Sequence, residues 1–534
     1  MQIKLKYSLL ITFLPSLLGL LALNSSAAVF DEQGLSDIAA NVAPAIEHCE
    51  EAIETGEFLE TFECGDELFE TRFNALDGAG MNVGNGERFT GVPRADLPNW
   101  RNVLPRRETG PNAEACNVCH TTETEGGGGD AAGPAGLNVI RDPFGSASLN
   151  GFIQRNTPHL FGMAGPQLLA EEMNADMLAI VSNTRIRACV TGSTRTADLT
   201  TKGINFGSVT VTPRVFFCLQ RAIVSINAQG VRPDLIVRPF QWKGNEPTVR
   251  TFSRGAFHNE LGMSPVETAG DNVDNDFDGI ANEITVADTT AMAIYLAGQP
   301  RPTSMTELDT LRDQMVAQFG AAGAAEADEL GLPDLSAAEV AQINRGEQTF
   351  NVIGCGDCHR ASLTVNNVVF NEPSLNPNYR ESVFPAGQNA AARGLDPNNP
   401  ISFDITQDQP DNIIEVNGNF VKHLGAFETD NNGGAVVRLY GDLKLHDMGP
   451  ALTESVDEAG TGASVWITKE LWGLRNTAPY LHDGRATTVE EAILEHGGEA
   501  NNSRNNFSSL NDDDQNDVLA FLNNLVLFFP AEED

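Results

Sequence analysis

The spacing of hydrophobic positions predicts helices in two stretches and strands in a third. Apolar residues recur at helical spacing in residues 336–350, SAAEVAQINRGEQTF, and in residues 512–529, DDDQNDVLAFLNNLVLFF. Ser336, with Glu339 three residues later, has the pattern of a capping box, which marks where the first of these helices begins. Residues 199–239 instead alternate polar and β-branched residues between turn signals, the pattern of a small sheet. We therefore predict a mainly α fold with a small β insertion.

The first 28 residues have the pattern of a secretory signal peptide. Lys4 and Lys6 precede an apolar run, Leu9–Leu23, and small residues follow at 26–28. The alternative is a transmembrane anchor, but the run is shorter than the ~20 residues that span a bilayer. The sequence therefore predicts a protein exported to the periplasm, with no stable membrane span.

The chain is strongly acidic. Its 34 basic and 73 acidic residues give a formal net charge of -39. A surface of this charge repels nucleic acid and anionic lipid, so neither is an expected partner. The same charge would steer a basic protein partner, although adaptation to salt explains it equally well.

The eight cysteines divide into two groups of four. One group lies in two Cys-x-x-Cys-His segments. The other group is Cys49, Cys64, Cys189 and Cys218, an even number that predicts disulfides in an oxidising compartment. Three pairings are open, and we favour Cys49–Cys64 with Cys189–Cys218 because each pair lies within one local segment.

The two Cys-x-x-Cys-His segments, at residues 116–120 and 355–359, have the pattern of covalent haem attachment. Two thiols form thioether bonds to the haem vinyl groups, and the adjacent histidine, His120 or His359, ligates the iron. A zinc site requires four ligands, and neither segment has a second Cys pair. A thioredoxin-like motif requires no histidine. The sequence therefore predicts two covalently attached haem c groups, at Cys116 and Cys119 and at Cys355 and Cys358.

Composition changes along the chain suggest its domain organisation. Residues 69–115 are rich in Gly, Pro, Asn and Arg, which predicts a long ordered loop. The predicted segments are a signal peptide (1–28), an acidic N-terminal extension (29–68), a first haem c domain (69–300) with the β insertion at 199–239, a linker with helices (301–335) and a second haem c domain (336–534). Two c-type cytochrome domains are therefore expected.

Two further matched segments indicate an internal repeat. Residues 155–158, RNTP, are echoed by residues 475–479, RNTAP, and residues 242–249, WKGNEPTV, by residues 482–489, HDGRATTV. Together with the two haem motifs, these matches predict two related haem domains.

With these motifs in view, the chain resembles the bacterial di-haem cytochrome c peroxidase superfamily. It is most similar to the branch of di-haem oxidoreductases that are often labelled thiol oxidoreductases. The resemblance covers about residues 70–530 and is most specific in LPRRETGPNAEACNVCH, IRDPFGSASLNGFIQRNTPHLFG, FQWKGNEPTVRTFSRGAFHNELGM, KLHDMGPAL and LWGLRNTAPYLHDGRATTVEEAILEHGGEA. It implies that a small redox protein donates electrons, that one haem relays them, and that the other haem reduces peroxide.

The resemblance also assigns residues between the two haem groups. Trp242 takes the place of the family's inter-haem tryptophan, and a core aromatic residue is the alternative. Asn156, Thr477 and Pro479 match positions that supply oxygen ligands to an inter-domain calcium ion. His482 matches a histidine on the loop near the peroxidatic haem.

The distal ligands implied by the resemblance differ between the two haem groups. The family's distal ligand of the second haem, usually Met, falls here on His496, so His359 and His496 would both ligate that iron and lower its potential. The alternative for His496 is a solvated histidine at a helix end. No histidine occurs between His120 and His159, so the first iron has an open position or a ligand from elsewhere. His159 and His446 are expected to bond propionates or backbone rather than iron.

The stretch GAFHNELGM, residues 255–263, matches the region that carries the family's catalytic carboxylate. Glu260 is the candidate for moving a proton between the peroxide oxygens. His258 either assists in this step or ligates the first iron; a hydrogen-bonded core histidine is the alternative.

A second metal signal lies in DNDFDGIANE, residues 274–283. Acidic residues stand on alternate positions with Gly at the sixth, which is typical of a calcium loop. Position twelve is Thr285 rather than Glu, so the loop is not a full EF-hand, and a solvated acidic turn is the alternative. The candidate ligands are Asp274, Asp276, Asp278 and Glu283.

Three functions remain open from the sequence. The first is a peroxidase-like di-haem oxidoreductase. The second is a non-enzymatic electron-transfer cytochrome, and this function is favoured if His258 ligates the first iron. The third is a di-haem oxygenase or an enzyme that oxidises thiols or proteins. Substrate, donor and oligomeric state are not encoded in any motif of the chain.

Overall fold

A computed structural model describes most of the chain from Pro44 onward. The described residues are 44–82, 88–89, 113–121, 126–129, 136–139, 152–274, 278–380, 390–391, 394–408, 412–454, 457 and 459–528. They all lie in one compact unit, Pro44–Asp534. The predicted signal peptide, residues 1–28, lies outside the described residues, and the other predicted segment boundaries stay predictions.

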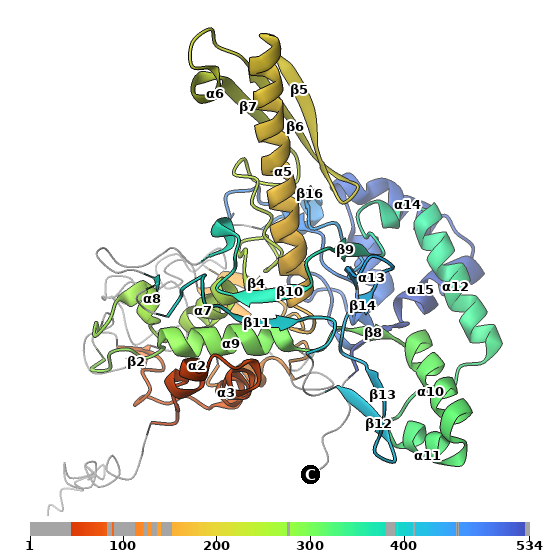
Figure 1. Cartoon of the computed structure of the whole chain (residues 1–534). Coiled ribbons are helices and arrows are strands. Elements are labelled where there is room, and N and C mark those ends of the chain that lie inside the picture. Colours follow the sequence, from red (N-terminus) through yellow and green to blue (C-terminus); the bar gives the residue numbers. More distant parts are fainter. Residues whose placement is uncertain are drawn as a thin grey trace, which may run out of the picture. The chain divides into compact units, whose positions relative to one another are not determined.

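The fold mixes helices with many short strands (Figure 1). The helices are α2 (Glu50–Thr55), α3 (Phe58–Glu70), α5 (Ala164–Thr191), α6 (Cys218–Arg221), α7 (Val249–Asn259), α8 (Val266–Ala269), α9 (Val286–Gly298), α10 (Met305–Phe319), α11 (Ala321–Glu329), α12 (Ala337–Val352), α13 (Val489–Glu495), α14 (Asn501–Ser508) and α15 (Asp512–Leu522). Both helices predicted from apolar spacing are present, as α12 and α15. Ser336 and Glu339 form the predicted capping box of α12.

The prediction of a mainly α fold is wrong, because the structure is 40% helical and 16% strand. The strands form two- and three-stranded antiparallel sheets: β1 (Met81–Asn82) with β2 (Arg88–Phe89), β3 (Gly136–Val139) with β4 (Phe152–Arg155), β5 (Arg195–Thr201) with β6 (Ile204–Thr212) and β7 (Ile223–Ala228), β8 (Thr303–Ser304) with β18 (Leu525–Val526), β9 (Leu363–Val365) with β15 (Ala435–Val437) and β14 (Glu428–Thr429), β10 (Val369–Glu372) with β11 (Ile401–Asp404), β12 (Ile413–Val416) with β13 (Asn419–His423), and β16 (Leu445–Asp447) with β17 (Val465–Ile467). The strands between residues 363 and 467 are two to five residues long, so none carries enough alternating positions to stand out as a pattern.

Each haem motif follows a helix that crosses a later helix at a glycine. Gly65 of α3 lies against α9, where a Cβ atom would overlap the carbonyl of Ala291. Gly346 of α12 lies against α15, where a Cβ atom would overlap the carbonyl of Asp517 (Figure 1). Without a side chain at the crossing point, the two backbones of each pair approach closely. The same helix pair is therefore built twice.

The internal repeat found in the sequence is present in the structure. The loops at residues 240–246 and 480–486 are both closed by an isolated antiparallel bridge, Phe240 with Glu246 and Tyr480 with Ala486. The second residue of each loop, Gln241 or Leu481, has a positive φ, 62° and 70° respectively. Two segments that share only part of their sequence therefore form the same turn.

The helices that follow these loops also begin alike. Thr248 caps α7 and Thr488 caps α13, and each threonine forms a capping box with the residue three positions later, Thr251 or Glu491. The side-chain hydroxyl accepts a backbone N–H that the first turn leaves unbonded. These caps fix the direction in which each helix leaves its loop.

The predicted β insertion is the three-stranded sheet β5–β6–β7, which packs beside α5 (Figure 1). It spans residues 195–228, so it begins before the predicted position 199 and ends before position 239. Both favoured disulfides are confirmed: Cys189–Cys218 joins α5 to α6, and Cys49–Cys64 joins the residue before α2 to α3.

A partly buried carboxylate anchors the start of α10. Glu307 accepts hydrogen bonds from Arg301, with Nη2 to Oε1 at 2.6 Å, from Lys422 at 2.5 Å and from the Thr303 hydroxyl at 2.6 Å. Burial opposes ionisation, but the bond and the charge of Arg301 outweigh it and lower the pKa of Glu307 from 4.5 to about 2.

We expect Glu307 to make the fold sensitive to acid. A depressed carboxyl pKa stabilises the fold fully above pH 4.5, and this stability is lost as pH falls toward 2. The shift corresponds to about 3 kcal/mol. The difference in unfolding free energy between the wild type and Glu307→Gln, measured by urea denaturation, should therefore narrow as pH falls through this window. A difference that stays constant with pH would contradict this assignment.

No helix among the described residues is both long enough and apolar enough to cross a bilayer. The longest, α5 with 28 residues, carries charged residues along its length.

Candidate haem sites

The two Cys-x-x-Cys-His segments form the same local structure. Each begins with a short 3-10 turn, Cys116–Val118 or Cys355–Asp357. The backbone N–H of the histidine then donates to the carbonyl of the first cysteine, at 3.2 Å for His120 and 3.0 Å for His359. The four cysteines of the segments are not in disulfides, whereas the other four form two disulfides. The turn therefore presents two thiols and one imidazole at each segment.

The imidazoles of both segments are neutral and oriented. Nδ1 of His120 donates to the carbonyl of Gly127 at 3.2 Å, and Nδ1 of His359 donates to the carbonyl of Tyr440 at 3.0 Å. Burial lowers the pKa of each imidazole to about 4. A histidine that donates from Nδ1 leaves the Nε2 lone pair for a metal, and a neutral ring is the form that ligates iron.

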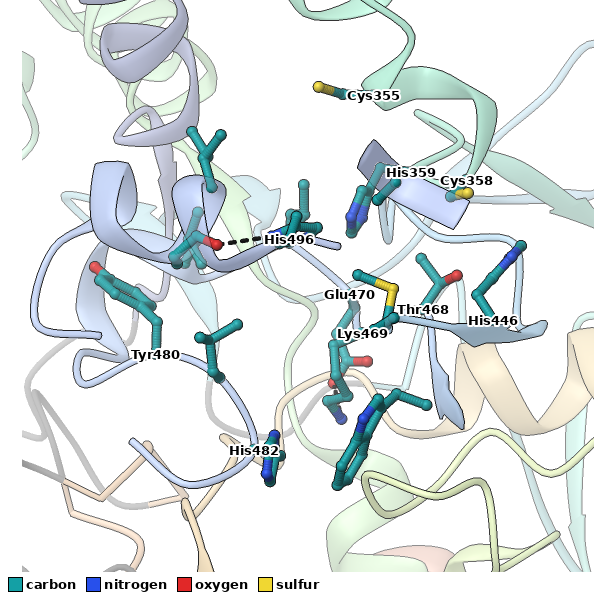
Figure 2. A pocket seen from close by; sticks show the side chains of 18 of the residues that line it. Cys355, Cys358, His359, His446, Thr468, Lys469, Glu470, Tyr480, His482 and His496 are labelled. Atoms are coloured by element: carbon teal, nitrogen blue, oxygen red, sulfur yellow. Dashed lines mark hydrogen bonds and ion pairs between the residues drawn. The ribbon is translucent and has the colours of Figure 1, made fainter. Parts of the chain in front are cut away.

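A cavity of about 380 Å³ lies beside the second segment. Cys355, Cys358 and His359 line it, together with apolar side chains that include Phe350, Leu471, Leu474, Ile493 and Leu522. Figure 2 shows the imidazoles of His359 and His496 close together in this cavity. The volume and the largely apolar lining are typical of a site for an organic cofactor.

His496 enters the cavity from the end of α13, where it is the C-cap residue. Its Nδ1 donates to the carbonyl of Ala492 at 2.7 Å, so Nε2 is again left as the acceptor. Burial lowers the pKa of His496, which keeps this ring neutral as well. His359 and His496 therefore offer two imidazoles to one cavity. Both rings are neutral, and both donate from Nδ1 to a backbone carbonyl.

The residues at the second segment fit a covalently attached haem. Two unpaired thiols, an apolar cavity and two imidazoles with Nδ1 bonded to backbone are the donor set of a bis-histidine haem c. His359 would be the proximal ligand, as predicted, and His496 the distal ligand.

Two further histidines in this cavity hold hydrogen bonds instead. His159 donates from Nε2 to the carbonyl of Trp472 at 3.0 Å, as expected of a residue that bonds backbone. Nδ1 of His446 lies 2.9 Å from Glu499, and its Nε2 lies 3.1 Å from Asp442. Burial opposes a charge on His446, but its hydrogen bonds, first to Asp442, raise its pKa to about 11. The sequence did not indicate Asp442 or Glu499, because no motif pairs them with His446.

The first segment has the same local chemistry with fewer described surroundings. The ring of Phe69 lies 6.2 Å from that of His120, as the ring of Phe350 lies 6.3 Å from that of His359. Residues 83–87, 90–112, 122–125, 130–135 and 140–151 lie outside the described residues. The described part presents Cys116, Cys119 and His120 in the arrangement of the second segment.

Both candidate acid–base residues lie at the end of α7, near the first segment. Burial, and to a smaller extent the charge of Glu260, raise the pKa of the Cys119 thiol to about 11. The carbonyl of Glu260 also accepts the backbone N–H of Ala113 at 3.1 Å. His258 donates from Nδ1 to the carbonyl of Met263 at 3.3 Å. The backbone of Glu260 is therefore bonded three residues before Cys116, and the roles of Glu260 and His258 stay predictions.

The candidate inter-haem residues meet at Asn156. Trp242 donates from Nε1 to the carbonyl of Asn156 at 2.9 Å, and the N–H of Asn156 donates to the carbonyl of His482 at 2.7 Å. The side-chain amide of Asn156 bonds the carbonyl of Pro479. Thr477 and Pro479 line the same cavity as Asn156 and Trp242. Two of the three predicted calcium ligands, Asn156 and Pro479, are thus in contact, and Thr477 lines the same cavity.

A second tryptophan in the cavity was missed by the sequence analysis. The Trp466 ring stacks on His482, with centroids 3.9 Å apart, and the Lys243 ammonium group lies 3.9 Å from the Trp466 ring centroid. Lys243 is fully buried and donates to the carbonyls of Gly462, Ala463 and Val465, each at 3.0 Å. The match between 242–249 and 482–489 was the available signal, because Lys243 and His482 both lie in it.

The acidic loop is only partly brought together. Asp274 accepts the backbone N–H groups of Asp278 at 3.2 Å and of Gly279 at 3.0 Å, as in a tight loop. Glu283 is buried and accepts the N–H of Ser264 at 2.7 Å. Asp276 lies outside the described residues. The described contacts fit a hydrogen-bonded acidic turn, and calcium at this loop stays a prediction.

Two matched segments, each with two thiols and a neutral imidazole, define a candidate di-haem protein. Residues 422–525 match a protein-family model described as "Di-haem oxidoreductase, putative peroxidase". This match supports the di-haem peroxidase-like family for the chain and confirms the resemblance found in the sequence. It includes His446, His482 and His496, while both Cys-x-x-Cys-His segments lie outside it. No curated protein matches the chain.

Proposed function

We propose that this chain is a periplasmic di-haem c oxidoreductase that reduces peroxide with electrons from a small redox protein. The observation that carries the proposal is the pair of matched thiol–imidazole segments. The segment at 355–359 lies beside a cavity with a second imidazole, and the charge of Glu260 acts on Cys119 of the segment at 116–120. The family description, which names an oxidoreductase, supports the same class of reaction.

The two sites suit different tasks. When bound, the haem groups would supply electron storage at the second segment and peroxide reduction at the first. His359 and His496 would both hold the haem at the second segment, which would leave no place there for a substrate. Glu260 would accept a proton from the inner peroxide oxygen and return it to the outer oxygen, which leaves as water. Trp242 lines the cavity beside the second segment and is hydrogen-bonded through Asn156 to the His482 loop, which supports an inter-haem role.

We also propose a calcium ion at Asn156, Thr477 and Pro479. The side-chain amide of Asn156 now faces the Pro479 carbonyl with its nitrogen. A rotation of this amide would bring its oxygen beside that carbonyl, so that both oxygens could bind one calcium ion. Carbonyl and amide oxygens are ligands that calcium prefers.

His258 supports a second candidate, an electron-transfer cytochrome without catalysis. Its Nδ1 bonds a backbone carbonyl, as does that of His496, which is the orientation typical of a histidine that ligates iron. If His258 ligated the first iron, both haem groups would be bis-histidine, and neither would bind peroxide.

One set of measurements separates the two candidates. A pyridine-haemochrome assay on the mature protein should give two haem groups per chain. Electron paramagnetic resonance of the resting and half-reduced protein should show a high-spin ferric signal from an open first site, with hydrogen peroxide turnover. Two low-spin signals in both states, with no turnover, would establish the electron-transfer protein instead. Protein without bound haem would overturn both.

The distal role of His496 can be tested by His496→Met. We expect the reduction potential of the second haem to rise by tenths of a volt, because a thioether donates less to ferric iron than an imidazole. Potentiometric titration would measure the shift. His423→Met, in β13 and outside the cavity, is the matched control and should leave both potentials unchanged. Equal potentials in the His496→Met variant and the wild type would exclude His496 as a ligand.

A further inference from the structure

The end of the α5 helix and its sheet carries an exposed apolar cluster. Val215, Phe216 and Phe217 are 92%, 74% and 71% exposed, in the connection between β6 and β7. Val190, near the end of α5, is 81% exposed. Leu219, Ile223 and Ile186 add to this cluster, each about half exposed. Large apolar side chains gathered in this way on a surface usually mark a site of interaction.

The topology places these residues at one end of the insertion. Arg195 at the start of β5 pairs with Val211 near the end of β6, and Val211 pairs with Val224 near the start of β7. The Cys189–Cys218 disulfide ties the end of α5 to α6 at the same end (Figure 1). We refer to residues 184–195 and 212–223 as the arginine-rich tip.

The charge of the arginine-rich tip is opposite to that of the chain. The tip contains five arginines and no acidic residue, within a protein of net charge -39. The arginines are Arg185, Arg187, Arg195, Arg214 and Arg221. The last four are exposed, and the guanidinium of Arg221 lies 5.5 Å from the Phe217 ring centroid. Phenylalanines surrounded by arginines are typical of segments that lie in the interface of an anionic membrane.

The rest of the insertion is built to hold this end away from the core. The first half of α5 is largely buried, and every residue of Ala164–Ala170 is buried. The last two turns of the helix are mostly exposed. The helix is 28 residues long, or roughly 42 Å at 1.5 Å per residue.

We infer that the arginine-rich tip docks the protein onto an anionic lipid surface, with Phe216 and Phe217 entering the interface and the arginines binding lipid phosphates. The acidic remainder of the chain would be repelled by the same surface, so contact would be restricted to the tip. A second copy of the chain fits this surface less well. The other exposed large apolar residues of the described chain are scattered over separate elements, and two tips of charge +5 would repel each other.

Vesicle flotation of the mature, haem-loaded protein tests this inference. We expect the protein to float with vesicles of phosphatidylcholine and phosphatidylglycerol, to bind pure phosphatidylcholine much more weakly, and to lose binding as salt increases. The double variant Phe216→Ser/Phe217→Ser should reduce the vesicle partition coefficient by about tenfold or more. Arg187→Ser/Arg221→Ser should give a similar loss on anionic vesicles only.

Phe420→Ser is the matched control, because Phe420 is 53% exposed in β13, outside the tip. It should leave flotation unchanged. Circular dichroism and the visible spectrum of each variant would show that the fold and the haem content are retained. Equal binding to neutral and anionic vesicles, no flotation at all, or an equal loss in Phe420→Ser would overturn the inference. So would a dimer by light scattering that Phe216→Ser/Phe217→Ser converts to monomer without any vesicle binding.

Discussion

Replacing Arg250 by methionine is expected to lower the unfolding free energy by about 3–5 kcal/mol. Arg250 is 1% exposed, and it bonds Glu267 of α8, Glu372 of β10 at 3.1 Å and Thr290 of α9 at 2.8 Å. Methionine fills a similar volume but leaves two buried carboxylates without their main cation. Chemical denaturation followed by circular dichroism would measure the loss.

Two further variants show whether unpaired charge is the cause. Arg238→Met removes a partly exposed pair with Asp234 and should cost less than about 1 kcal/mol. The triple variant Arg250→Met/Glu267→Gln/Glu372→Gln should recover part of the lost stability, because neutral side chains cost less to bury than unpaired carboxylates. A triple variant less stable than Arg250→Met alone would instead assign the loss to packing.

Replacing Glu260 by glutamine is expected to reduce kcat for hydrogen peroxide by about 10²–10⁴-fold. Glutamine keeps the size and polarity of the side chain but cannot take up the proton from the inner peroxide oxygen. Steady-state turnover with a reduced donor protein would measure the change. The haem content and the resting magnetic spectra should stay as in the wild type, since Glu260 is not an attachment residue.

Glu114→Gln is the matched control for this prediction. Glu114 lies two residues before Cys116, and its side chain is 59% exposed in a pair with Arg72 at 3.5 Å. Turnover should be unchanged in this variant. If Glu260→Gln retained wild-type kcat, the proton transfer would have to be assigned to another group, with His258 as the nearest candidate in the sequence.

The sequence predicted the features that depend on local spacing. The two haem motifs, the capped helix at Ser336, the final helix and both disulfides follow from residues that lie close together in the chain. The repeat of 242–249 in 482–489 was also visible, because loops with the same bridge and the same cap keep glycine and threonine at fixed positions.

Features that depend on distant residues could not be predicted. The salt bridges of His446 join residues up to 53 positions apart, and the Trp466–His482 stack joins strand β17 to a loop with no shared motif. The short sheets between 363 and 467 are held by pairing between segments, so no single strand shows a long alternating pattern. This is why the fold was predicted as mainly α. The arginine-rich tip was hidden by the net charge, which averages a local basic patch into an acidic total.

The hydrogen bonds at Asn156 also bear on how the two repeats became one protein. Trp242 and His482 occupy equivalent positions of the repeat. The carbonyl of Asn156 accepts from the Trp242 indole, and the N–H of Asn156 donates to the carbonyl of His482. If the halves were produced as separate chains, Asn156 would keep its bond to Trp242 but lose its bonds to His482 and Pro479, which cross between the halves. The duplicated modules have therefore become mutually dependent, and neither is expected to persist alone as a working ancestral unit.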